Sequence, residues 1–384
     1  MEINLLYWVW LTDICGVYNN DINALLEQFD TVDEIYKATD YSGVSNVKPL
    51  TLKKLRDKSL KRAEKIKEDC EKIGAQIITF DDIRYPDSLR VISNPPYVLY
   101  MRGEIMKWDR ILGIGVVGTR NCSDYGHKAT GFIVKDLALC GATIISGMAA
   151  GIDGLAARAA LDSGNKTIAV LGTAIDNPYP WENRGLMQKI IENGTVISEY
   201  PPGAKTQRTS FPWRNRIISG LSKGVLVIEA PEKSGALITA SYALEQGKDI
   251  FAVPGNIFKK ESTGTNNLLS NGAKAVGSAT DILSEYVYEI ERLNIKKPTA
   301  ISKIFSKSEK IDNEIKLSID DKRFSGLSDS DKKIISLLIE GNMHIDDIAR
   351  KSEIPTGELT TKLAMLEFSG HIQKIPGNNY KLNV

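Results

Sequence analysis

The chain has 384 residues, which is the length of two or three domains, and its 42% hydrophobic content is ordinary for a protein with a full core. Its 49 Lys and Arg against 48 Asp and Glu give a formal net charge of +1, which excludes a protein that coats DNA through overall positive charge but not one with a focused anion site. No apolar run approaches the roughly 18 residues of a membrane span, and residues 1–4 lack a signal-peptide pattern, so we expect a cytoplasmic protein without a membrane partner.

Few side chains of this sequence suit a metal ion. The four Cys are scattered, and the three His (His127, His344 and His371) neighbour neither a Cys nor one another. Zinc sites and disulfide frameworks need ligands at characteristic spacings. We therefore expect reduced thiols, no metal, no cofactor and little support for histidine-assisted catalysis.

The first 75 residues have the apolar spacing of helices. Apolar side chains recur there every three or four positions, and residues 50–73 add dense Lys and Glu. We expect a helical module over residues 1–75. Residues 13–17 are compatible with a helix–hairpin–helix turn, although a Gly after any helix gives the same pattern.

From residue 76 the pattern changes to short apolar, β-branched runs that alternate with helical segments. Two short strands, 76–80 and 98–101, precede runs at 111–117, 143–146, 167–171, 195–198, 225–229 and 250–253. This alternation predicts an α/β fold in which helices cover both faces of a parallel sheet. We expect an extended Rossmann-like domain over residues 76–288, with its ligand at the carboxyl ends of the strands.

The end of the chain holds two further segments. Residues 289–325 are rich in Lys, Glu, Asp and Ser, which predicts a charged linker. Residues 326–384 fit three short helices and two strands around a Pro-Gly-Asn-Asn turn. Three helices with a small β-ribbon are typical of a winged helix.

The most informative local feature is the basic segment that follows the apolar run at residues 195–198. No Asp or Glu occurs between residues 200 and 228. Guanidinium groups bind phosphate oxygens, and adjacent aromatic rings offer stacking faces to single-stranded nucleic acid. A solvated basic loop before a helix has the same composition, so this segment alone leaves both interpretations open. Its candidate residues are Lys205, Arg208, Phe211, Arg214, Asn215 and Arg216.

Small and hydroxyl residues follow the predicted strands. Because the carboxyl ends of parallel strands meet at one edge of the sheet, we expect these residues and the basic segment to form a track for several successive phosphates. The further candidate residues on this edge are Gly118, Thr119, Arg120, Ser146, Gly147, Gly151, Ser234, Gly235 and Thr239.

Three carboxylates accompany these loops, and we expect supporting roles for them. Asp153 is placed to cap the helix that follows it. Glu199 and Glu229 are expected to orient basic side chains such as Arg214 and Arg216 by ion pairing. No catalytic residue is predicted.

Taken together, the motifs resemble the bacterial DprA/Smf family of DNA-processing proteins. The resemblance implies a non-enzymatic protein that binds single-stranded DNA without sequence preference, dimerises through its core and loads a RecA-type recombinase onto incoming DNA during natural transformation. The matching motifs lie in order between residues 85 and 279 and include Gly118-Thr119-Arg120, Ser146-Gly147, Gly151-Ile152-Asp153, Ser198-Glu199, residues 211–221, Ser234-Gly235 and Val253-Pro254-Gly255.

Two positions depart from the family pattern, and two other functions stay open. Ala157 stands where the family usually has His, and Ala174 stands where a Gly is usual. A hydrolase of nucleotide N-glycosidic bonds would need a Gly-rich loop followed by Glu, and residues 261–265 resemble such a loop only weakly. A winged-helix transcription regulator would need a more basic third helix than residues 356–370, which hold Lys362 but no Arg. We interpret the winged helix as a protein-contact or regulatory module.

Overall fold

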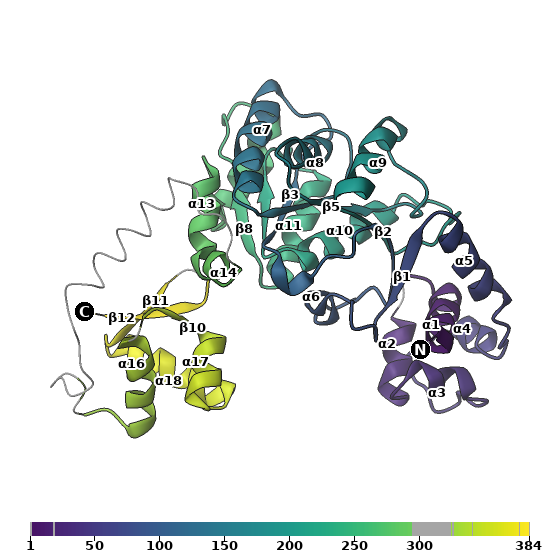
Figure 1. The fold of residues 1–384 in the computed structure, drawn as a ribbon, viewed down its shortest axis with the longest axis horizontal. Coiled ribbons are helices and arrows are strands. Elements are labelled where there is room, and N and C mark those ends of the chain that lie inside the picture. Colours follow the sequence, from purple (N-terminus) through teal and green to yellow (C-terminus); the bar gives the residue numbers. More distant parts are fainter. Residues whose placement is uncertain are drawn as a thin grey trace. The chain divides into compact units, whose positions relative to one another are not determined.

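The computed structural model describes residues 2–17, 20–293, 324, 326–339, 341–375 and 377–383. The chain divides into two compact units, Met1–Gly277 and Ser278–Val384 (Figure 1). Most of the predicted linker, residues 289–325, lies outside the described residues.

The first unit is built on a nine-stranded mixed sheet with the order β1-β2-β6-β5-β4-β3-β7-β8-β9. β2 pairs antiparallel with β1 and β6, and all other neighbours are parallel. The predicted α/β fold with a mainly parallel sheet is therefore confirmed, and the antiparallel pair extends it at one edge. The strands are β1 (Ala75–Thr79), β2 (Val98–Gly103), β3 (Gly113–Val117), β4 (Thr143–Ser146), β5 (Thr167–Leu171), β6 (Thr195–Ser198), β7 (Gly224–Val227), β8 (Asp249–Ala252) and β9 (Lys274–Ala275).

Helices cover both faces of this sheet. Along β5, Ala169 and Leu171 pack into one buried cluster with α8 and α9, while Ile168 and Val170 pack into the other with α6, α10 and α11. This alternation follows from the two-residue period of a strand. The helices between the strands are α6 (Asp87–Arg90), α7 (Asp124–Leu139), α8 (Ile152–Asp162), α9 (Arg184–Asn193), α10 (Ser210–Leu221), α11 (Gly235–Glu245) and α12 (Thr263–Ser270), with 3-10 turns η1 (Trp108–Arg110), η2 (Trp181–Asn183) and η3 (Lys260–Ser262).

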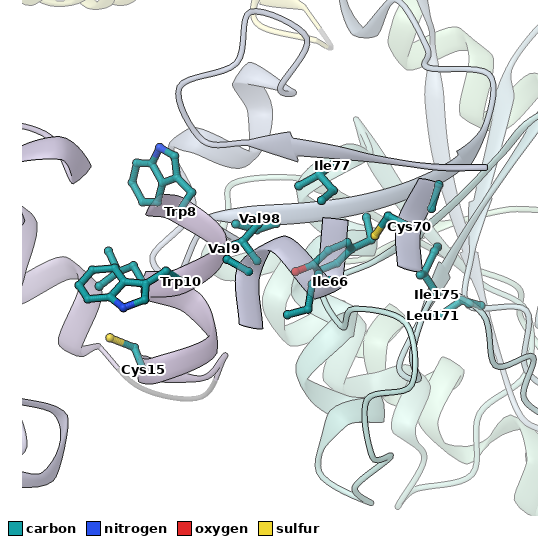
Figure 2. Packing of buried hydrophobic residues seen from close by; sticks show 14 of the residues in the cluster. Trp8, Val9, Trp10, Cys15, Ile66, Cys70, Ile77, Val98, Leu171 and Ile175 are labelled. Atoms are coloured by element: carbon teal, nitrogen blue, oxygen red, sulfur yellow. The ribbon is translucent and has the colours of Figure 1, made fainter. Parts of the chain in front are cut away.

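The N-terminal helices share a buried cluster with the sheet. Trp8 and Val9 of α1 belong to this cluster together with Ile66 of α5, and Ile77 and Val98 bring in the edge strands (Figure 2). The first unit thus contains both the predicted helical module and the α/β core. The helices are α1 (Glu2–Cys15), α2 (Asp21–Gln28), α3 (Val32–Lys37), α4 (Pro49–Lys54) and α5 (Lys61–Lys72).

A lysine lies within an aromatic cage between α4 and α5. The ammonium nitrogen of Lys58 lies 5.0 Å from the ring centroids of Trp10 and Tyr41 and 5.5 Å from that of Tyr36. Aromatic faces attract cations, but burial lowers the pKa of Lys58 to about 8.

This cage makes the stability of the first unit depend on pH. Between pH 8 and about 10.5 the unfolded chain holds a proton on Lys58 that the folded chain has released, so stability rises with pH in this window. Lys58→Met lacks this contribution to the pH dependence of stability. Between pH 7.5 and 9.5 we expect the thermal unfolding midpoint of wild type to rise relative to that of Lys58→Met. A difference between the two midpoints that stays constant with pH would contradict the prediction.

The second unit contains a winged helix, as the sequence predicts. Ile334, Ile348 and Leu363 form a core under the three-stranded sheet β10-β12-β11. The two-residue strand β10 was not predicted, because two residues carry no periodicity. The elements are α13 (Ala279–Leu283), η4 (Ser284–Tyr286), α14 (Val287–Arg292), α16 (Asp329–Ile339), β10 (Met343–His344), α17 (Ile345–Ser352), α18 (Thr356–Phe368), β11 (Ile372–Ile375) and β12 (Asn379–Leu382).

Candidate nucleic-acid interface

A cleft of about 350 Å³ lies at the carboxyl ends of the central strands. It is formed by the loop after β3, the start of α8, the start of α10 and the start of α11. Helix N-termini present unpaired backbone N–H groups, which favour anions. Of the predicted site residues, Gly118, Thr119, Arg120, Asp153, Phe211, Arg214, Asn215, Ser234, Gly235 and Thr239 line this cleft.

Arg120 and Phe211 form an accessible pair in the cleft. The Arg120 side chain is exposed, and its guanidinium carbon lies 5.5 Å from the centroid of the Phe211 ring. Tyr179 extends the aromatic surface, with its ring centroid 4.9 Å from that of Phe211. The arrangement offers one cation to a phosphate and aromatic faces to a base.

The start of α11 supplies the polar side of the cleft. Ser234 caps this helix by accepting a hydrogen bond from the Ala236 N–H at 3.3 Å. The Thr239 hydroxyl is buried at the wall of the cleft, and no described residue forms a hydrogen bond with it. A buried hydroxyl without a partner costs free energy, which a ligand oxygen would offset.

Arg214 is buried beneath the cleft. Its Nη1 donates to the carbonyl oxygens of Gly147, at 2.7 Å, and Val170, and its Nη2 lies 3.7 Å from Asp153 Oδ2. Burial lowers the pKa of Arg214 to about 10, so the guanidinium remains charged at neutral pH. Because the Arg214 side chain is only 6% exposed, it contributes positive potential to the cleft rather than a direct contact to phosphate.

The predicted capping role of Asp153 is wrong. Gly151, with φ 73°, takes the N-cap position, so α8 begins at Ile152 and Asp153 lies within its first turn. The Asp153 carboxylate accepts a hydrogen bond from the Gly147 N–H at 3.1 Å. It therefore fixes the loop after β4 and faces Arg214. Gly147 leaves the space that the Arg214 side chain occupies, because a Cβ there would lie 1.9 Å from an Arg214 nitrogen.

Arg216 does not join the cleft, and the expectation that it converges with Arg120 and Arg214 is wrong. Residues two apart in a helix point about 200° away from each other. The Arg216 side chain is 3% exposed; its Nη2 lies 2.7 Å from Glu199 Oε1 and its Nε donates to the Asn94 carbonyl at 2.8 Å. It faces a small separate cavity that the N-terminal helices also line.

The two glutamates differ in what they hold. Glu199 pairs with Arg216, as expected for a supporting carboxylate. Glu229 has no arginine partner among the described residues, which corrects the prediction. Because β7 lies beside β3, Glu229 meets the loop after β3 and accepts hydrogen bonds from the Ser123 N–H at 2.9 Å and hydroxyl at 2.5 Å. It thereby fixes the start of α7.

The remaining predicted residues lie outside the cleft. Lys205 and Arg208 are exposed on the loop between β6 and α10, and Ser146 is buried at the end of β4. Lys233, which lines the cleft just before Ser234, was missed. Its position beside the Ser-Gly motif is the signal that would have indicated it.

The described part of the chain contains neither a cluster of metal-binding side chains nor a helix that could span a membrane. No group of three or more His, Cys, Asp or Glu side chains there is placed to hold a metal ion. None of the helices in that part is both long enough and apolar enough to cross a membrane.

Comparison with known proteins identifies the family. The model of the DNA recombination-mediator protein A family matches residues 76–287. The chain belongs to this family. A second model, the DprA winged helix domain, matches residues 325–378 of the chain.

Members of the family from several bacteria are similar to this chain. Protein Smf of Synechocystis sp. is 33% identical to this chain, over 98% of this chain and 98% of its own. DNA processing protein DprA of Bacillus subtilis is 42% identical over 55% of this chain and 71% of its own.

Two solved family structures resemble this one. The X-ray structure of DprA from Streptococcus pneumoniae has a TM-score of 0.65 and 35% identity, covering 73% of this chain and 97% of its own. A Helicobacter pylori DprA structure, described for its single-stranded DNA binding mode, has a TM-score of 0.51 and 32% identity, covering 56% of this chain and 97% of its own.

Proposed function

We propose that this protein binds single-stranded DNA without sequence preference, through the cleft at the carboxyl ends of the central strands. The observation that carries the proposal is the exposed Arg120 guanidinium stacked on Phe211, beside the N-terminus of α11. A phosphate would bind the guanidinium and the helix N-terminus, and an unstacked base would stack on the aromatic face. Duplex DNA keeps its bases stacked inside and cannot use that face. The single-stranded DNA binding described for the Helicobacter pylori relative supports the same assignment.

The roles of the candidate residues follow from their burial. Arg120 and Phe211 are proposed to contact DNA directly, and the α11 residues Ser234, Gly235 and Thr239 to receive a phosphate. The exposed Lys205, Arg208 and Lys233 are proposed to neutralise flanking phosphates. Because the cleft has the size of about one nucleotide, we propose one anchored nucleotide rather than a continuous buried track. Arg214, Asp153 and Gly147 are positioning residues beneath it.

We further propose the cellular role of the recombination-mediator family for this chain. In that role the protein loads a RecA-type recombinase onto incoming DNA during natural transformation, acts in the cytoplasm and forms a homodimer through its α/β core. Family membership supports this proposal. The domain organisation that goes with it is a helical module (1–75), the DNA-binding domain (76–288), a linker (289–325) and the winged helix (326–384).

The winged helix is not proposed to read DNA. Lys362 of α18 lies 3.4 Å from Asp331 and 3.9 Å from Glu358, so its charge is already neutralised. A helix that reads DNA normally carries net positive charge toward the groove. We therefore retain the protein-contact or regulatory role for this module.

The binding preference is tested by competition. A fluorescent single-stranded oligonucleotide bound to the protein should be displaced by the unlabelled strand at much lower concentration than by its duplex, at matched salt. Strands of different sequence should compete equally. Equal competition by the duplex would contradict the proposal.

We also propose that the site performs no bond cleavage. Its carboxylates are already engaged: Asp153 with Gly147, Glu199 with Arg216 and Glu229 with Ser123. A general base needs a free, positioned carboxylate. Incubation with nucleoside monophosphates and oligonucleotides should release no base and cut no strand. Turnover that disappears in Glu199→Gln or Glu229→Gln would show that the protein is an enzyme.

A further inference from the structure

Helix α7 carries apolar side chains on two sides. Ile133, Val134 and Leu137 are buried beneath it, while Tyr125, Phe132 and Leu139 are 49%, 59% and 53% exposed on its outer side. A surface helix of a globular protein normally has one apolar stripe, which faces the core. A second stripe indicates a second packing partner. Figure 1 shows α7 on the outside of the α/β core.

The outer stripe has one apolar residue in every seven. Tyr125, Phe132 and Leu139 are seven residues apart, which is about two helical turns, so they lie in one line along the helix. The line extends over about 21 Å at 1.5 Å per residue. It offers a regular seam, in contrast to the scattered apolar residues of an ordinary surface.

Positive charge accompanies the stripe on one flank. Lys128 and Lys135 are also seven residues apart, and both are exposed. At 100° per residue they lie within about 60° of the Phe132 direction, on the same side of it. Within the described residues neither lysine has an ion-pair partner. Charged residues that flank an apolar seam select the partner helix by charge.

We propose that the outer face of α7 docks an amphipathic helix of a partner protein, one with apolar residues at heptad spacing and Asp or Glu along its flank. α7 carries two carboxylates that are not buried: Asp124, at its first residue, and the partly exposed Asp136, which lies about 40° from Phe132 on the flank opposite the lysines. A second copy of α7, paired antiparallel about Phe132, would bring Lys128 of one copy alongside Lys135 of the other and leave Asp136 on the far flank. An acidic helix pairs with both lysines.

Synthetic helices test this surface on the full-length protein. The probe is a fluorescein-labelled three-heptad peptide with Leu at a and d and Glu at e and g, and its twin carries Lys at e and g. At about 0.1 M salt the Glu peptide should raise the fluorescence anisotropy on binding, with an affinity at least about tenfold above that of the Lys peptide. Phe132→Ser should weaken binding about tenfold or more.

A charge swap on α7 is the decisive test. The double variant Lys128→Glu with Lys135→Glu should no longer bind the Glu peptide and should bind the Lys peptide instead. Lys189→Glu, on the exposed side of α9, is the matched control and should change neither affinity. Single-stranded DNA affinity and circular dichroism report that each variant is folded.

Three results would overturn the proposal. The first is no binding of the Glu peptide up to about 100 µM, and the second is equal binding by wild type and Phe132→Ser. The third is a concentration-dependent dimer in sedimentation that Phe132→Ser abolishes, because the occupant of the stripe would then be a second copy.

Discussion

Arg216→Ala is expected to destabilise the first unit by about 3–5 kcal/mol, although this side chain is not proposed to touch DNA. The substitution leaves the Glu199 carboxylate, which is 7% exposed, without its charged partner, and it removes the hydrogen bond to the Asn94 carbonyl. The stacking of the guanidinium on Trp213, 4.4 Å from the ring centroid, is lost as well. The midpoint of urea unfolding measures the change.

Two further variants make this test specific. Arg208→Ala, in the exposed loop before α10, should shift the free energy of unfolding by no more than about 0.5 kcal/mol. The double variant Arg216→Ala with Glu199→Ala should recover part of the loss, because it leaves no unpaired buried charge. If Arg216→Ala unfolded at the same midpoint as Arg208→Ala, the buried pair would not stabilise the fold.

Arg120→Ala is expected to lower the affinity for single-stranded DNA about 10- to 150-fold without changing stability. Hydrogen bonds to charged groups contribute about 1.5–3 kcal/mol, which corresponds to that range. The Arg120 side chain is exposed and its main contact is the Phe211 ring, so the fold does not depend on it. Fluorescence anisotropy with a labelled oligonucleotide measures the loss.

The matched control for Arg120 is an arginine at the opposite edge of the sheet. Arg110 is exposed in η1, just before β3, and therefore lies at the amino end of a strand whose carboxyl end forms the cleft. Arg110→Ala should leave DNA affinity unchanged. An equal loss in both variants would mean that general positive charge, rather than the cleft, binds the strand.

The sequence predicts the fold better than it predicts the directions of the side chains. The strands and the edge at which their loops gather follow from apolar alternation, which is a property of neighbouring residues. The placement of Arg214 and Arg216 on different sides depended on α10 beginning at Ser210, which places both in one helix, two positions apart. Had that boundary been predicted, the burial of one of them away from the cleft would have followed.

Contacts between distant segments account for the other errors. Glu229 meets Ser123 because the strand order places β7 beside β3, and no local pattern fixes strand order. Asp153 lies inside α8 because Gly151 adopts a positive φ and packs against the Thr119 carbonyl, where a Cβ would lie at 2.3 Å. Such loop geometry depends on the packed fold rather than on the order of residues in the loop.

The most direct test of the account measures binding of wild type and Arg120→Ala to one oligonucleotide and to its duplex over a series of salt concentrations. We expect wild type to prefer the single strand at every salt concentration. Because each phosphate contact to a single strand contributes a slope of about −0.7 to the log–log plot of affinity against salt, Arg120→Ala should show a slope shallower by about that amount. Equal affinity for strand and duplex, or identical slopes for the two proteins, would contradict the proposal that this cleft binds single-stranded DNA.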